Sequence, residues 1–181
     1  MRHTLIALVE DRPGALNRVL GLLRGRGLGV YSVAIGDSEK PNVKRTTVLV
    51  DTDVAEQMIK QLNRLIEVLE VIDVTHAQYV VRETALVKIN APEPLREEIR
   101  AVAEGFGARI IGGCTQTVVV EMTDTPDRLG ELIERAKSFG PCETMRSGSL
   151  AMALGAPAQR TNATVPEEAS AAWWAQADGV S

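Results

Sequence analysis

The same order of apolar patterns occurs twice along this chain, and that repeat strongly limits the folds open to it. The first half contains four strand-like apolar runs, at residues 4–10, 30–37, 43–51 and 68–74. Two segments with the 3.6-residue spacing of a buried helix face lie between them, at residues 14–25 and 54–65. This order predicts strand–helix–strand–strand–helix–strand, a split βαβ unit with both helices on one face of its sheet.

The second half repeats the pattern at an offset of roughly 80 residues. Its strand-like runs are residues 84–89, 108–113, 116–122 and 142–147. Its helical patterns are residues 95–106 and 129–136. The predicted fold class is therefore α+β, with two ferredoxin-like βαββαβ sandwiches in tandem.

The predicted boundaries are residues 1–78 for the first domain and 79–155 for the second. Residues 156–181 break the pattern, because Ala, Pro, Gln, Thr and Glu dominate there. We expect this tail to be disordered. It contains the only tryptophans, Trp173 and Trp174, whose alternative interpretation is an apolar anchor for a partner.

Composition excludes several classes of protein. The chain of 181 residues is 45% apolar, enough for one medium core or two small ones. A net charge of −4 and a pI of about 5.3 argue against a nucleic-acid surface, which would be basic. No apolar stretch is long enough to cross a membrane. Because Met1–Thr4 runs directly into a strand pattern with no signal peptide, a cytoplasmic location is expected.

The turn at residues 10–15 is the strongest candidate for a binding site. An apolar run ends in Glu10-Asp11-Arg12-Pro13-Gly14, and a helical pattern begins at once. The amides at a helix start, together with the helix dipole, favour an anion. A free amino acid carries such an anion, and its ammonium group could be met by Asp11. We interpret the turn as an amino-acid sensor; the alternative is ordinary helix initiation, with the glycine enabling the turn.

The sequence lacks the residues that catalytic, phosphate-binding and metal sites require. The sequence shows no Ser/His/Asp or Cys/His arrangement and no phosphate-binding loop. The two histidines, His3 and His76, lack a third ligand for a metal. The two cysteines, Cys114 and Cys142, lie in or beside apolar runs and are expected in the core. At the position matching the turn, the second half has Ala91-Pro92-Glu93-Pro94, whose carboxylate would repel an anion.

Several segments, taken in order, resemble one known family. Residues 9–23 resemble the start of the small subunits of acetolactate synthase (acetohydroxyacid synthase), and the turn itself resembles the ligand turn of ACT domains. Further similar segments follow at residues 44–47, 61–65, 68–71, 82–89 and 145–148. The resemblance covers residues 2–155 and leaves out only the tail.

The resemblance implies a regulatory subunit with no catalytic residues, metal or cofactor of its own. Such a subunit binds a large catalytic subunit, which carries thiamine diphosphate, Mg²⁺ and FAD. It raises the activity of that subunit and makes it sensitive to valine or a related branched-chain amino acid. The large subunit condenses pyruvate with a second 2-oxo acid, the committed step toward branched-chain amino acids. The alternative is a stand-alone ACT-domain amino-acid sensor that acts on another target.

Carried over residue by residue, the resemblance predicts a site built from a turn and a strand. The effector carboxylate lies on backbone donors around Pro13, and Asp11, where the family often has Asn, faces the ammonium group. Gly29 of the other subunit, where the family usually has Asn, completes the pocket together with Val30. The full predicted set is Asp11, Arg12, Pro13, Gly14, Ala15, Leu16, Gly29 and Val30. Arg18 and Arg45 are interpreted as solvated charges and left out.

A homodimer is the expected state of the chain. In a βαββαβ unit one face of the sheet has no helix to cover it, and the edge strands carry unpaired backbone groups. We therefore expect the N-terminal sheets of two copies to pair.

Overall fold

The computed structural model describes residues 1–24 and 29–155. The chain forms two compact units: Met1–Gln78 together with the described residues 153–155, and Tyr79–Met152. The expected disorder of the tail and the predicted end of the first helix at residue 25 lie outside the described residues.

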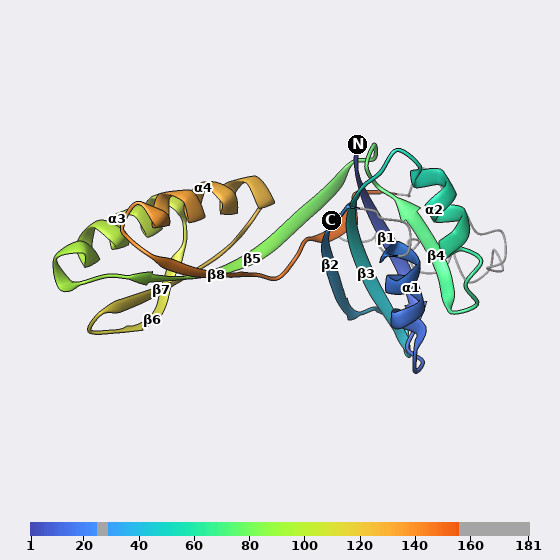
Figure 1. Ribbon diagram of the computed structural model, residues 1–181, viewed down its shortest axis with the longest axis horizontal. Coiled ribbons are helices and arrows are strands. Elements are labelled where there is room, and N and C mark those ends of the chain that lie inside the picture. The colour runs from blue at the N-terminus through green and yellow to red at the C-terminus, as the bar shows by residue number, and fades with distance from the viewer. Residues whose placement is uncertain (25–28, 156–181) are drawn as a thin grey trace, which may run out of the picture. The chain divides into compact units, whose positions relative to one another are not determined.

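The first unit is a four-stranded antiparallel sheet with two helices on one face (Figure 1). Its elements are β1 (Arg2–Glu10), α1 (Ala15–Arg24), β2 (Gly29–Asp37), β3 (Val43–Asp51), α2 (Ala55–Leu62) and β4 (Val68–Asp73). The strand order is β2-β3-β1-β4, so β2 and β4 are the edges.

The core of the first unit lies between the sheet and its helices. Alternate residues of β1, namely Leu5, Ala7 and Val9, face the helices and are at most 2% exposed. Leu23 of α1 and Met58 of α2 pack against them and are equally buried. Burying each of these Leu, Val and Met side chains contributes roughly 1.5–3 kcal/mol. The strand-like apolar run of residues 4–10 and the 3.6-residue helix patterns predicted a core of this kind.

The other face of this sheet is also buried at its centre. Ile6 and Leu8, which alternate with the core residues of β1, are 1% and 6% exposed. No described helix of this unit lies on that face, as expected, although these two central residues are buried. The open edge at β2 is the second feature on which the expected pairing of two copies rests.

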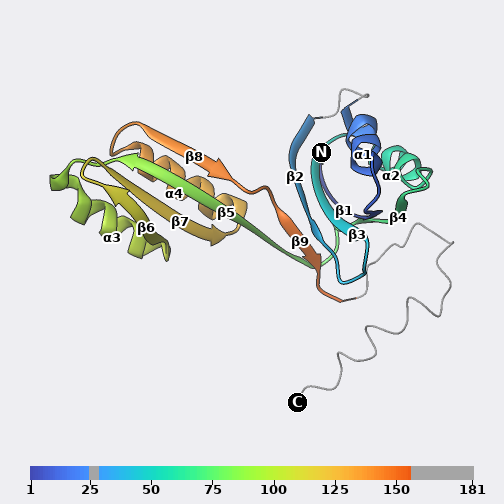
Figure 2. The ribbon, with the colours of Figure 1, turned by 90° about the horizontal axis from the view of Figure 1, so that it is seen from below.

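The second unit repeats the plan and adds a strand (Figure 2). Its elements are β5 (Tyr79–Asn90), the 3₁₀ turn η1 (Glu93–Leu95), α3 (Arg96–Phe106), β6 (Arg109–Cys114), β7 (Thr117–Asp124), α4 (Pro126–Lys137), β8 (Cys142–Arg146) and β9 (Leu150–Ala153). The order is β6-β7-β5-β8, with β9 paired to β5. The α+β prediction of two ferredoxin-like units in tandem is confirmed.

Two details of the second unit differ from expectation. Strand β9 was not predicted, because a four-residue apolar segment carries too little periodicity to identify a strand. Cys114 is exposed at the end of β6, whereas Cys142 is half-buried against the core. The core prediction is thus wrong for Cys114, which lies where the β6–β7 hairpin leaves the packed part of the sheet.

Candidate functional site

The turn between β1 and α1 is held by its own backbone. The amide of Arg12 donates to the carbonyl of Glu10 (2.9 Å), and the amide of Ala15 donates to the carbonyl of Arg12 (3.1 Å). The amide of Arg18 then donates to the carbonyl of Gly14 (3.0 Å), which begins the helix. The amide of Ala15 is therefore used within the turn itself, and Pro13 has no amide hydrogen to donate. The amides that directly follow Ala15 have no preceding turn of helix to accept from them, and these are the donors that the start of α1 offers to an anion.

Gly14 adopts a backbone conformation that other residues avoid. Its φ is +81°, in the left-handed region. A Cβ at this position would lie 3.5 Å from Nη1 of Arg18. The glycine thus serves the turn geometry, which both the amino-acid-site interpretation and the helix-initiation alternative require.

Two backbone hydrogen bonds tie the turn to its neighbours. The amide of Glu10 donates to the carbonyl of Glu67 just before β4, and the amide of Asp11 donates to the carbonyl of Asn42 in the β2–β3 hairpin, both at 2.8 Å. Asn42 itself has a φ of +58°, which asparagine tolerates in tight turns. The position of the turn is therefore set by the β2–β3 hairpin as well as by β1.

Three basic side chains around the turn are paired with acids. Nε of Arg12 lies 2.9 Å from Oε2 of Glu10, and Arg18 hydrogen-bonds Glu67. Nζ of Lys44, on β3, lies 3.4 Å from Oδ2 of Asp11 and 2.5 Å from Oδ1 of Asp37. The surroundings of the turn thus carry both signs of charge, which suits a zwitterion better than a simple anion.

These pairs shift the titration of their members in the expected directions. The hydrogen bond from Lys44 lowers the pKa of Asp37, and the bonds to Asp37 and Asp11 raise the pKa of Lys44. The hydrogen bond from Arg18 lowers the pKa of Glu67. The hydrogen bonds therefore favour the charged forms of Asp37, Lys44 and Glu67.

Gly29 and Val30 lie at the other end of the sheet from the turn. Gly29 pairs with Asp51, which in turn pairs with Arg2 at the start of β1, whereas the turn follows Glu10 at its end. The intervening length of β1 is roughly 25 Å at 3.3 Å per residue. Within one chain, six of the eight predicted residues are therefore together, and these two are apart from them.

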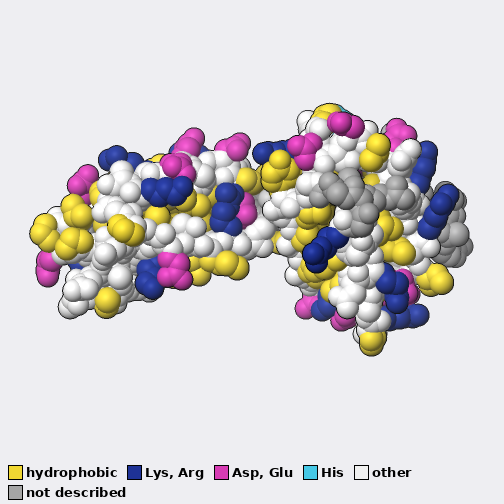
Figure 3. Space-filling view, in the orientation of Figure 1, with side chains coloured by type: hydrophobic (Ala, Val, Ile, Leu, Met, Phe, Trp, Pro, Cys, Tyr) yellow, Lys and Arg dark blue, Asp and Glu magenta, His cyan; other side chains and the backbone are white. Residues whose placement is uncertain are grey.

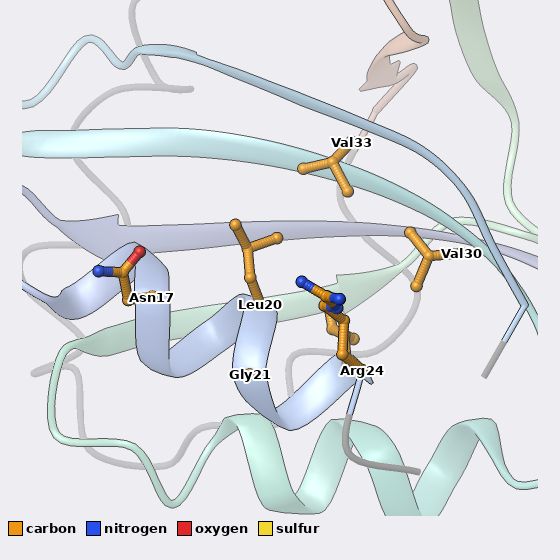
Figure 4. Close-up of a pocket in the computed structure, with 7 residues that line it drawn as sticks. Asn17, Leu20, Gly21, Arg24, Val30 and Val33 are labelled. Carbon is orange, nitrogen blue, oxygen red and sulfur yellow. The ribbon is translucent and has the colours of Figure 1, made fainter. Parts of the chain in front are cut away.

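A groove runs between α1 and the edge strand β2 (Figure 4). Its volume is about 660 Å³. Its walls are mainly apolar, formed by Asn17, Leu20, Gly21, Leu23, Arg24, Val30 and Val33. Of the predicted site residues only Val30 lines it. The sequence carried one signal for this groove, an exposed glycine, Gly21, inside a helix.

Sequence reasoning also missed Lys44 and set Arg18 aside. Lys44 pairs across the sheet with both Val9 and Asp37, so its place beside the turn follows from strand register. The predicted strands 30–37 and 43–51 are joined by a short loop, and a hairpin of this kind could have indicated that Lys44 pairs with Asp37. Its distance to Asp11 depends on how β1 and β3 align, which one sequence does not specify.

Acidic and basic side chains are mixed over the visible face of each unit, and neither sign dominates (Figure 3). Among residues 1–24 and 29–155, no three His, Cys, Asp or Glu side chains are grouped to hold a metal ion. In the same part of the chain, no helix is long and apolar enough to cross a membrane. His3 and His76 lie close, with ring centroids 6.5 Å apart.

Comparison with known proteins covers both units. Residues 5–70 match the family model described as "AHAS small subunit-like ACT domain", and residues 82–155 match the one described as "Small subunit of acetolactate synthase". The chain belongs to the acetolactate synthase small-subunit family. Relatives in this family include the probable acetolactate synthase small subunit of Archaeoglobus fulgidus, 38% identical over 157 residues, which are 86% of this chain and 98% of the relative.

Two further comparisons agree. The acetolactate synthase small subunit of Mycolicibacterium smegmatis is 35% identical over 155 residues, covering 84% of this chain and 91% of the relative. The crystal structure of the small subunit from Thermotoga maritima superposes with a TM-score of 0.79 at 29% identity, covering 86% of this chain and 99% of that one. The resemblance deduced from the sequence is thereby confirmed.

Proposed function

We propose that this chain is the non-catalytic regulatory subunit of acetolactate synthase. It binds the large catalytic subunit, raises its turnover and confers feedback inhibition by valine or a related branched-chain amino acid. The observation that carries the proposal is membership of the small-subunit family across both units, combined with the Pro13-Gly14 turn at the start of α1. Thiamine diphosphate, Mg²⁺ and FAD belong to the catalytic subunit, and the chain acts in the cytoplasm.

The effector binds at the turn, with its two charged groups recognised separately. The carboxylate accepts hydrogen bonds from the backbone amides at the start of α1, where the helix dipole favours it. The ammonium group lies against the carboxylate of Asp11, whose side chain is 50% exposed and accessible from solvent. Charges of both signs around the turn support a zwitterionic ligand.

The homodimer forms through the open edge of the first sheet. Strand β2 pairs only with β3 among the described strands, and the groove beside it is apolar. If two copies of β2 pair antiparallel about Val33, the middle residue of Gly29–Asp37, the partner copy's residue 29 comes opposite Asp37. Asp37 contacts Lys44, which contacts Asp11. Dimerisation would thus bring the two separated parts of the predicted site together.

The test uses this protein, its matched large subunit, and a mixture of the two. Acetolactate formation from pyruvate is measured for each, with and without valine, leucine or isoleucine. We expect no product from this chain alone, a severalfold increase in turnover for the mixture, and inhibition of the mixture by one of the amino acids.

Two results would count against the proposal. If the mixture is no faster than the large subunit alone, the chain is not a regulatory subunit of that enzyme. Calorimetric titration of the chain with amino acids would then test the alternative, a stand-alone amino-acid sensor. Activation without inhibition by any of the three amino acids would leave an activator that lacks the proposed effector site.

A further inference from the structure

One ammonium group of the protein already lies beside the carboxylate proposed to receive the ligand's ammonium group. Nζ of Lys44 is 3.4 Å from Oδ2 of Asp11. The Lys44 side chain is only 26% exposed, because it lies in the sheet beside Val9, whereas that of Asp11 is half exposed. A ligand that approaches Asp11 from solvent therefore meets a carboxylate that is already partly neutralised.

Lys44 has a second and nearer acceptor. Its Nζ is 2.5 Å from Oδ1 of Asp37, the last residue of β2 and its direct partner across the sheet. A separation of 2.5 Å is a short hydrogen bond, whereas 3.4 Å to Asp11 is a looser electrostatic contact. Lys44 is thus held mainly by Asp37, and its electrostatic contact with Asp11 is the weaker of the two.

The spacing of these three groups is fixed by the backbone around them. The amide of Asp11 donates to the carbonyl of Asn42 at 2.8 Å, which joins the turn to the hairpin that carries both Asp37 and Lys44. Three residues from three strands or their ends therefore form one small charge network. One cation serves two anions, and a second ammonium group could be accepted without leaving either carboxylate unpaired.

We propose that Lys44 is an internal competitor for the ammonium subsite at Asp11, and that Asp37 sets the effector affinity by drawing Lys44 away. This inference rests on the proposed function and extends it to the regulation of the same site. When an amino acid binds, its ammonium group pairs with Asp11 and Lys44 remains on Asp37. Where Asp37 cannot hold the lysine, Lys44 moves onto Asp11 and the ligand must displace it.

The inference predicts opposite effects of two substitutions. Lys44→Met keeps the length of the side chain but removes the competing charge, so valine should bind more tightly. Asp37→Asn releases Lys44 toward Asp11, so valine should bind more weakly. Because both carboxylates are exposed to solvent and their charges are screened, we expect changes of roughly two- to fivefold in each direction.

The experiment is calorimetric titration of the full-length protein with valine and with (S)-2-hydroxy-3-methylbutanoate. The hydroxy acid keeps the carboxylate and the side chain of valine but has no ammonium group. The ratio of the two affinities therefore isolates the ammonium subsite from general effects on folding. Lys60→Met is the matched control, because Lys60 is 74% exposed on α2 and pairs with Glu56 one helical turn away.

The expected result is a higher ratio of valine to hydroxy-acid affinity in Lys44→Met, a lower ratio in Asp37→Asn, and no change in Lys60→Met. Valine binding with an unchanged ratio in both variants would overturn this inference while leaving the effector site in place. Weaker valine binding by Lys44→Met would also overturn it, because Lys44 would then assist the ligand. Failure of valine to bind either the parent protein or Lys44→Met would overturn it together with the effector site.

Discussion

Arg18 lies directly beside Gly14, with its Nη1 atom 3.5 Å from the point that a Cβ on residue 14 would occupy. The guanidinium is held there by its hydrogen bond to Glu67, and Gly14 itself has a φ of +81°. Any side chain added at residue 14 therefore meets an unfavourable backbone conformation and a neighbouring cation. It also enters the space next to the first amides of α1.

The first prediction is that Gly14→Asp abolishes inhibition by the effector and preserves activation. The added carboxylate would compete with the effector carboxylate for the same amides and would attract Arg18 away from Glu67. Loss of the site removes an allosteric coupling of about 1–3 kcal/mol, which is five- to 150-fold in affinity. The measurement is inhibition by valine, leucine and isoleucine, with each variant saturating the large subunit.

Gly14→Ala separates the effect of charge from that of backbone strain. We expect it to weaken inhibition less than Gly14→Asp does, because it adds strain and one methyl group only. Gly105→Ala in α3 is the control: no atom lies within 4 Å of the point that its Cβ would occupy, and inhibition should not change. Inhibition unchanged in Gly14→Asp would mean that the effector binds elsewhere.

Most of the fold could be predicted from periodicity alone. The predicted strand 43–51 coincides with β3, and the predicted strand 30–37 differs from β2 by one residue. These segments are long, and their patterns are reinforced by glycine, proline and asparagine at the turns. Strand β5 begins at Tyr79, five residues earlier than predicted, because its first residues lack the alternation seen in Thr84–Ile89.

Only part of the candidate site could be predicted from the sequence. Residues adjacent in the chain, from Asp11 to Leu16, necessarily lie together, and Gly14 has the backbone conformation expected of it. The contact between Lys44 and Asp11 joins residues 33 positions apart and depends on strand register. Whether Gly29 joins the turn depends on a second copy of the chain, and no local pattern specifies that.

The second prediction concerns the groove between α1 and β2. Gly21 is exposed there, and no atom lies within 4 Å of a Cβ built on it. Gly21→Arg should therefore leave the folded monomer intact and fill the groove with a charged side chain. Light scattering at micromolar concentration should show a dimer for the parent protein and a monomer for this variant.

Gly105→Arg provides the matched control for that experiment, since Gly105 is also an exposed glycine in a helix. It should remain dimeric. A parent protein that is monomeric without the catalytic subunit would contradict the homodimer, and a dimeric Gly21→Arg would place the interface away from this groove.

The third prediction concerns an ion pair in the second unit whose carboxylate is buried. Glu83 is 6% exposed and accepts a hydrogen bond from Arg146 of β8, which also donates to the carbonyl of Pro126 at the start of α4. Glu83→Gln leaves the arginine without its counter-charge and should lower the free energy of unfolding by about 2 kcal/mol. Urea denaturation measures this, and Lys88→Met, which breaks the exposed pair with Glu143, should change it by less than about 1 kcal/mol.

Adding Arg146→Met to Glu83→Gln tests the coupling between the two residues. The double variant should be less destabilised than the sum of the single variants, because neither charge is then left alone. Simple additivity would mean that the pair does not act as a unit.

The last prediction is a loss of stability in acid that depends on Asp73. Burial acts to raise the pKa of this carboxyl, but hydrogen bonds from the hydroxyl and amide of Thr75 and from His3 outweigh it and hold the pKa below its ordinary value of 3.8. A carboxyl whose pKa is lower in the folded state stabilises the fold above about pH 4 and loses that contribution as the pH falls through the folded-state pKa.

Asp73→Asn should therefore be less stable than the parent at pH 6 by about 1 kcal/mol, the worth of one such hydrogen bond. The difference should shrink as the pH falls below 3.8, because Asp73 then binds a proton more readily in the unfolded state than in the folded state. Urea denaturation at several pH values and fixed protein concentration measures the difference, with Glu56→Gln, 92% exposed on α2, as the control. A difference that stays constant from pH 6 to pH 3 would show that the ionisation of Asp73 contributes nothing to stability.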